Sequence, residues 1–298
     1  MPILTTDYFL SILVRETRSP TIGILGDYPK LTDEQKPKFS HVAASVHSQQ
    51  QMFPRRAVIE FPPKEHSADS LGEVEADDQH RYYVKGDAHG RPVRASEWLC
   101  TRIAEHVGIG APTPVVVELL NGLVVFGSRR IPNVADGVVT QAYLSQPTAS
   151  NIGQPPVGLA SILASIYAFD MFMYNVDRHL GNYLSVDDNG TRRVYSFDFS
   201  RALFWNWPWS GFPLPSENTR QWGAVLRSMH GFDQQAAFVT LDRLSGLGFN
   251  TIEGFIKEMP PDWTPGDVGS QFHSFWSGNG RQSRIIQLRT GITDGTLL

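Results

Sequence analysis

Residues 175–182 read NVDRHLGN and residues 196–200 read SFDFS, and these two stretches decide the fold. The first places Asp177 five positions before Asn182, in a loop that follows a long apolar segment. The second places Asp198 after two short β runs, and a hairpin formed by these runs would return Asp198 to the end that holds Asn182. Amide and carboxylate oxygens are hard ligands of the kind that Mg²⁺ prefers. The sequence therefore predicts a magnesium site formed by Asn182 and Asp198, with Asp177 beside it.

The spacing of these residues is typical of phosphoryl transfer. In protein kinases a catalytic-loop Asp precedes a metal-binding Asn by five positions, and the Asp of D-F-G follows later. Here Asp198 leads D-F-S instead. Phosphoryl transfer needs a positioned acceptor and neutralised phosphate charge, so Asp177 is the candidate catalytic base. Asp and Asn are also common turn residues, so a structural loop is the alternative. The buried helix before the loop and the strand-bounded Asp198 after it favour catalysis.

A lysine and a glutamate upstream are the candidate phosphate-binding pair. Lys85 ends the apolar strand 81–85, and Glu97 lies twelve positions later, early in a predicted amphipathic helix over 93–107. In kinases a strand lysine is held against the phosphates by a helix glutamate. A snorkelling surface lysine and a solvated glutamate are the alternative. The downstream motif favours the functional interpretation.

Two further segments are predicted to contact the nucleotide. Ser67 and Ser70 lie in the turn 66–72, whose hydroxyl and backbone N–H groups can cap phosphates. The turn has one glycine, so it is neither a G-x-G-x-x-G loop nor a P-loop. Gly127 and Ser128 follow a β run, where a segment contacting adenine is expected.

The order of elements predicts an α+β fold with two lobes and a cleft between them. Residues 1–55 form an N-terminal extension of unknown role. Residues 56–131 contain short β runs and one helix, and form the β-rich N-lobe. Residues 132–298 form the mostly helical C-lobe, including a nearly all-apolar helix over 159–174.

Composition narrows the class of protein. The chain has 298 residues, 41% of them hydrophobic, and a net charge of -4, which gives no sign of direct nucleic-acid or membrane binding. Cys100 is the single cysteine, which excludes an intrachain disulfide and a multi-cysteine zinc site. No signal peptide and no membrane-spanning run is present, so a soluble cytoplasmic protein is expected.

The combination of the 175–182 stretch with Phe197 and Asp198 resembles the HipA-like serine/threonine kinases, relatives of the protein and phosphoinositide kinases. The segment 82–118, with its Tyr-Val-Lys strand, is similar to their N-lobe, and the likeness covers about residues 59–203. The resemblance implies ATP and Mg²⁺ as cofactors.

In residue terms the resemblance implies Asp177 as base, Asn182 and Asp198 as magnesium ligands, and Lys85 as the phosphate-binding lysine. Full-length toxins of the family act with an antitoxin partner and tend to act on the translation apparatus. An antitoxin or other regulatory protein is thus implied as a partner. Residues 1–55 are short for the family's N-terminal domain, and the glycine-poor loop departs from its pattern, with Ser67 and Ser70 as candidates for autophosphorylation.

Three functions remain compatible with these residues. The first is phosphorylation of serine or threonine in a protein substrate. The second is another transfer from ATP on the same fold, to a lipid headgroup or small molecule, or with AMP as the group moved. The third is a non-catalytic binding module with a degenerate kinase fold.

Overall fold

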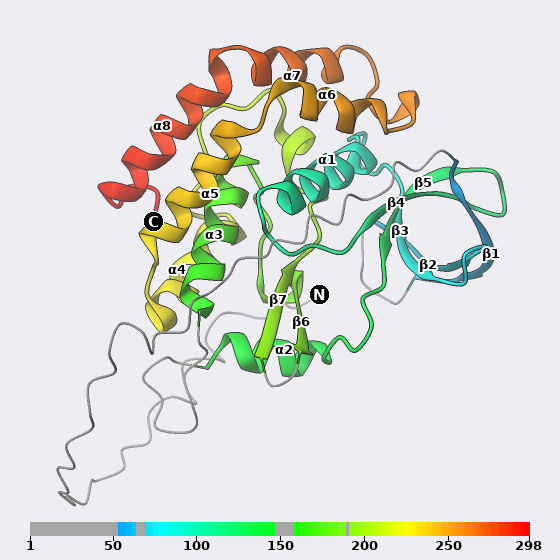
Figure 1. The fold of residues 1–298 in the computed structure, drawn as a ribbon, viewed down its shortest axis with the longest axis horizontal. Coiled ribbons are helices and arrows are strands. Elements are labelled where there is room, and N and C mark those ends of the chain that lie inside the picture. The colour runs from blue at the N-terminus through cyan, green and yellow to red at the C-terminus, as the bar shows by residue number, and fades with distance from the viewer. Residues whose placement is uncertain (1–52, 64–68, 147–157, 189–190) are drawn as a thin grey trace, which may run out of the picture. The chain divides into compact units, whose positions relative to one another are not determined.

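The computed structural model describes residues 53–63, 69–146, 158–188 and 191–298 (Figure 1). The first part of the described chain contains five strands, which close into a barrel in the order β1-β2-β3-β5-β4. Neighbouring strands are antiparallel except β1 and β4, which pair in parallel. The strands are β1 (Arg55–Phe61), β2 (Ser70–Ala76), β3 (Arg81–Lys85), β4 (Pro114–Glu118) and β5 (Val124–Arg129).

The barrel has a small core of its own. Alternate residues of β2 are buried, as expected of strands with one face inward. Gly127 lets β5 approach β4 closely, because a Cβ atom there would lie 2.6 Å from Val117 Cγ2. The turn at Asn121 and Gly122, a dipeptide typical of hairpin turns, joins β4 to β5, and Gly122 has a φ of +82°. The core residues are Ala57, Val74, Ala76, Tyr82, Val84, Val115, Val117, Leu119 and Val125.

Helix α1 (Val93–His106) lies between β3 and β4 in sequence but packs into the core of the helices. Trp98 is buried and its Nε1 donates to the carbonyl of Phe255 at 3.0 Å. Ser96 Oγ accepts from the backbone N–H of Phe204 at 3.2 Å. In Figure 1, α1 lies between the barrel and α6, and it contacts both. The helix that carries Glu97 is therefore anchored to the helical part of the chain.

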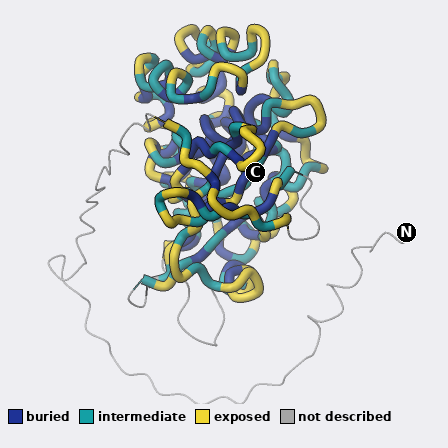
Figure 2. Tube along the Cα trace, turned by 90° about the vertical axis from the view of Figure 1, so that its right-hand side faces the viewer, coloured by how far each residue is buried: buried dark blue, intermediate teal, exposed yellow. Residues whose placement is uncertain are grey.

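The rest of the described chain is mainly helical. Helix α3 is buried along most of its length, as its apolar sequence predicts, and Figure 1 shows α4 and α5 beside it. Figure 2 shows that the buried residues of the described chain gather in its interior. Helices α4 and α5 pack against α3, and the hairpin of β6 and β7 follows the 175–182 loop. The elements are α2 (Gly137–Leu144), α3 (Leu159–Phe172), β6 (Tyr183–Asp188), β7 (Thr191–Ser196), α4 (Asn218–His230), α5 (Gln234–Gly246), α6 (Phe249–Lys257), α7 (Val268–Ser277) and α8 (Asn279–Thr293).

The segment between β7 and α4 is fixed by an aromatic cluster around Arg284. The guanidinium of Arg284 is buried, lies 4.6 Å from the Trp209 ring and 4.3 Å from the Phe212 ring, and donates to the carbonyl of Gly211. It also donates to the carbonyls of Met171 and Phe172 at the end of α3. The segment after Asp198 is thus tied to α3 through one side chain of α8.

The prediction of a mixed fold of strands and helices is confirmed. No helix among the described residues is long and apolar enough to cross a membrane.

Candidate active site

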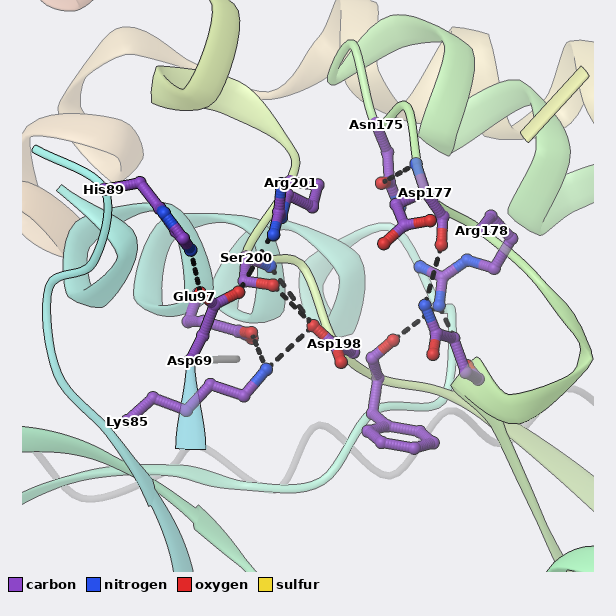
Figure 3. Close-up of polar contacts among 12 residues, drawn as sticks. Asp69, Lys85, His89, Glu97, Asn175, Asp177, Arg178, Asp198, Ser200 and Arg201 are labelled. Carbon is purple, nitrogen blue, oxygen red and sulfur yellow. Dashed lines mark hydrogen bonds and ion pairs between the residues drawn. The ribbon is translucent and has the colours of Figure 1, made fainter. Parts of the chain in front are cut away.

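Lys85, Glu97 and Asp198 form one hydrogen-bonded network. The Nζ atom of Lys85 lies 2.6 Å from Glu97 Oε1 and 2.7 Å from Asp198 Oδ1. Figure 3 shows the three side chains converging from β3, from α1 and from the segment after β7. The Glu97 side chain is 3% exposed and that of Asp198 is 30% exposed, so the network opens toward solvent on the Asp198 side.

The electrostatics of this network follow from burial and from the two carboxylates. Burial alone would lower the pKa of Lys85, but Asp198 and Glu97 outweigh it and raise that pKa. Burial raises the pKa of Glu97, which Lys85 partly offsets. For Asp198, the effects of Lys85 and Ser200 exceed that of burial and hold its pKa well below the usual range. At neutral pH the network therefore presents a charged ammonium group and an ionised Asp198.

Asp198 keeps one carboxylate oxygen for a ligand. Both Lys85 Nζ and Ser200 Oγ donate to Oδ1, the latter at 2.7 Å, and no hydrogen bond from the described residues uses Oδ2. Asp198 has a φ of +62°, an uncommon value for a residue other than glycine. A sparsely populated backbone conformation at a polar residue is frequent at functional sites.

A hydrogen bond also orients the side chain of Asn182. Its Nδ2 donates to the carbonyl of Asp177 at 2.8 Å, and Oδ1 accepts no hydrogen bond from the described residues. Among these residues, no group of three or more His, Cys, Asp or Glu side chains could hold a metal ion. A site formed by Asn182 and Asp198 would supply only two protein ligands. This suits Mg²⁺, which keeps several waters and is commonly shared with substrate phosphates.

Asp177 is fixed through its backbone and its carboxylate. Its N–H donates to Asn175 Oδ1 at 3.1 Å. Its Oδ1 accepts from Asn218 Nδ2 at 2.5 Å, a contact from the first residue of α4.

Arg178 connects the loop that holds Asp177 to the segment that holds Asp198. Its guanidinium pairs with Asp170 of α3 through two bonds of 2.7 and 3.0 Å, and both side chains are buried. It also donates to the carbonyls of Asn182 and Phe197. One arginine thereby links the main chain at Asn182 to the main chain next to Asp198, the two candidate magnesium ligands.

The other predicted nucleotide contacts lie in or near the barrel. Ser70 is in register with Lys85, and its Oγ accepts from the N–H of Gly72 at 3.1 Å. Gly127 and Ser128 lie within β5, paired with β3 on one side and β4 on the other. Ser67 lies outside the described residues. The structure thus places Ser70 beside Lys85, while the nucleotide-binding role of all four residues stays a prediction.

A charged cluster lies next to the network, where Asp69 meets Arg201 and His89 (Figure 3). Asp69 Oδ2 is 3.7 Å from Arg201 Nε, and Asp69 Oδ1 is 3.5 Å from His89 Nε2. The Arg201 guanidinium lies 4.0 Å from the Trp205 ring. The end of the turn 66–72 is therefore held against the segment that follows Asp198.

Sequence reasoning missed two residues of the site. Asp170 is the one acidic residue in the apolar helix α3. A buried charge requires a partner, so Asp170 could have been identified from the sequence as a residue with a buried partner. Asn218 lies 41 residues from Asp177, and nothing in its local sequence marks it.

Comparisons with known proteins found similarity to kinases. Residues 73–206 match the family model described as HipA-like kinase. No curated protein matches the sequence. The structure is similar to that of the Helicobacter pylori proinflammatory kinase CtkA, with a TM-score of 0.52 and 14% identity over 79% of this chain and 96% of that one.

A second similar structure is Shewanella oneidensis HipA in its complex with HipB and operator DNA. Its TM-score is 0.46, with 12% identity over 80% of this chain and 68% of that one. The family match confirms the resemblance noted in the sequence and supports a kinase-type phosphotransferase.

Proposed function

We propose that this chain, whose residues 73–206 match the HipA-like kinases, is an ATP- and Mg²⁺-dependent phosphotransferase that moves the γ-phosphoryl group to a hydroxyl acceptor. The observation that carries the proposal is the contact of Lys85 with both Glu97 and Asp198. Residues 85, 97 and 198 are far apart in sequence, and kinases require a comparable arrangement of a lysine, a glutamate and a metal-binding aspartate.

The proposed architecture has two lobes. Residues 56–131 form the N-lobe and residues 132–298 form the C-lobe, after an extension over residues 1–55. The nucleotide would lie between the lobes, with Ser67, Ser70, Gly127 and Ser128 contributing contacts on the N-lobe side.

Each of the central side chains has a distinct role in this proposal. Lys85 binds the phosphates, and Glu97 keeps its ammonium group in place. Asn182 Oδ1 and Asp198 Oδ2 would hold Mg²⁺, which neutralises phosphate charge as the transition state forms. Asp177 accepts the proton of the acceptor hydroxyl.

The preferred acceptor is a serine or threonine of a protein, in line with the family. Transfer to a lipid headgroup or small molecule, or transfer of AMP, would use the same central residues. The intact mass of a modified target separates the addition of a phosphoryl group from the addition of AMP. An antitoxin or regulatory protein as a partner, and a cytoplasmic location, are implied by the family resemblance alone.

The test combines ligand binding with turnover. A ligand that binds the native state raises the apparent stability, so ATP with Mg²⁺ is expected to raise the Tm of the purified protein. The Asp177→Ala variant is expected to keep this shift and to lose phosphate transfer, because Asp177 acts on the acceptor. If the wild-type protein shows neither a Tm shift nor ATP consumption, the proposed function is wrong and a non-catalytic module becomes the better interpretation.

A further inference from the structure

The first residue of α4 reaches the candidate base directly. Asn218 Nδ2 donates to Asp177 Oδ1 at 2.5 Å, and no other hydrogen bond from the described residues reaches the Asp177 carboxylate. Asn218 lies outside the region that matches the HipA-like kinase model, which ends at residue 206. We infer that Asn218 is a positioning residue, which orients the Asp177 carboxylate toward the acceptor hydroxyl. The inference rests on the proposed function and adds a residue to it.

The start of α4 is rigid where Asn218 makes this contact. The neighbouring Thr219 is buried, and its Oγ1 donates to the carbonyl of Asn175 at 2.6 Å and accepts from the N–H of Arg178 at 3.0 Å. On the other side, Glu217 accepts from the N–H of Leu214 at 2.6 Å. The donor of the Asn218 amide is therefore held relative to the 175–182 loop by hydrogen bonds independent of its own.

Among the described residues, the rest of the loop makes no hydrogen bond to the Asp177 carboxylate. Asn175 and Asn182 hold the backbone N–H and carbonyl of Asp177, which fixes the main chain only. The bond from Asn218 selects one carboxylate orientation, with Oδ1 occupied and Oδ2 left to accept a proton. A general base must lie within hydrogen-bond reach of the proton that it removes, so orientation of Oδ2 governs its efficiency.

The reaction step that this orientation serves can be written in full. The acceptor oxygen forms a bond to the γ-phosphorus while the bond from that phosphorus to the ADP oxygen breaks. The electron pair of the broken bond leaves with ADP, and the proton of the acceptor hydroxyl passes to Asp177 Oδ2. Asn218 takes no part in bond making and acts through Asp177.

Substitution of Asn218 tests the inference with the full chain and a saturating acceptor. For Asn218→Ala we expect kcat to fall by up to about 100-fold, the cost of a small misplacement of a reacting group, with the KM for ATP unchanged within about twofold. Asn218→Asp is nearly isosteric, but it replaces the donor by a like charge beside Asp177, which favours protonation of the base. We therefore expect the acid limb of the pH profile of kcat to move to higher pH in this variant.

The matched control is Asn279→Ala, because Asn279 is also the first residue of a helix, α8, and is exposed. A merely structural role for Asn218 predicts a lower Tm with no movement of the pH profile. Should Asn218→Ala not fold, Asn218→Asp carries the test, since a carboxylate is favourable at a helix N-terminus.

Two failures can be told apart. If the wild-type chain transfers no group from ATP, the proposed function fails, and the inference fails with it. If the wild-type chain is active and both Asn218 variants keep its kcat and pH profile, the inference alone is overturned.

Discussion

Lys85 is the residue whose surroundings say most about the chemistry of this protein. It lies between a deeply buried carboxylate, Glu97, and a partly exposed one, Asp198. Breaking a buried pair by removing one partner is costly, because the other charge stays buried without compensation. Substitution of Lys85 should therefore lower both activity and stability, and the loss of stability should depend on pH.

The Lys85→Met variant is expected to lose phosphate transfer and to acquire a new pH dependence of stability. Without the ammonium group, the pKa of Glu97, already raised by burial, rises further. A folded state whose carboxyl pKa lies above the unfolded value binds more protons than the unfolded state. The free energy of unfolding therefore rises as the pH falls from the folded-state pKa toward the unfolded-state pKa. We expect the Tm deficit of the variant relative to wild type to shrink between pH 8 and pH 5.5.

Thermal melts at several pH values check this expectation. Lys257→Met is the control, because Lys257 is an exposed lysine paired with Glu253 on the surface. Surface pairs of this kind contribute little to stability, so this variant should track the wild type. A deficit of Lys85→Met that is constant across pH would show that Glu97 is not left as a buried charge.

At the residue scale, the sequence predicted best those site residues that lie in one loop or on adjacent elements. Asp177 and Asn182 lie in one loop, and the network shows that Lys85 and Glu97 are in contact, as their positions on a strand and the next helix suggested. Asn218 could not be found in this way, because its contact depends on how α4 packs against the 175–182 loop.

At the scale of elements, the segment between Asp198 and α4 owes its conformation to Arg284. Trp205, Trp207 and Trp209 alternate along this segment. Trp207 and Trp209 pack against Phe272 and Phe275 of α7. These ring contacts join the segment to α7.

The Arg284→Met variant should loosen this segment and lower stability. It removes the donor to the carbonyls of Met171, Phe172 and Gly211, and a buried acceptor left without a partner costs about 1–3 kcal/mol. We expect a loss of at least about 2 kcal/mol in urea unfolding and a weaker near-ultraviolet circular dichroism signal from the tryptophans.

The control for Arg284 is Arg193→Met, which removes an exposed arginine paired with Asp188. Equal stability of the two variants would mean that the aromatic cluster holds the segment without the arginine. Retention of the tryptophan signal in Arg284→Met would support the same conclusion.

The elements themselves were predictable to different degrees. The apolar run of α3 and the hairpin turn between β4 and β5 have strong local signals, and the structure places both where the sequence does. The helices after residue 218 were expected only as a helical region. Their amphipathic faces are defined by the neighbours they pack against, and one sequence does not specify those neighbours.

At the scale of the whole described chain, there are two hydrophobic cores, and α1 belongs to the larger one. Its residues Trp98, Leu99 and Ile103 share a core with α3, α6 and α7, whereas the barrel core contains no α1 residue. Arg94 and Arg102 add ion pairs to Asp262 and Glu258 on the helical side. The N-lobe expected over residues 56–131 includes α1, which also contacts β4 and β5, and this division of the chain stays a prediction.

Hydrogen exchange should follow the packing of α1 rather than its place in the sequence. Local opening is easiest where few apolar contacts are buried, so the amides of β1–β3 are expected to exchange faster than those of α1 and α3. Lys85 lies in β3 and bonds to Asp198. ATP with Mg²⁺ bound at this pair is therefore expected to stabilise the strands and to slow their exchange more than that of α1. Mass spectrometry of peptides from the intact protein, with and without the nucleotide, measures both effects.

If α1 exchanges together with the strands, the helix moves with the barrel, and Glu97 is not anchored by the helical core. If instead α1 exchanges with α3, the pairing of Lys85 with Glu97 is controlled by movement of the barrel alone.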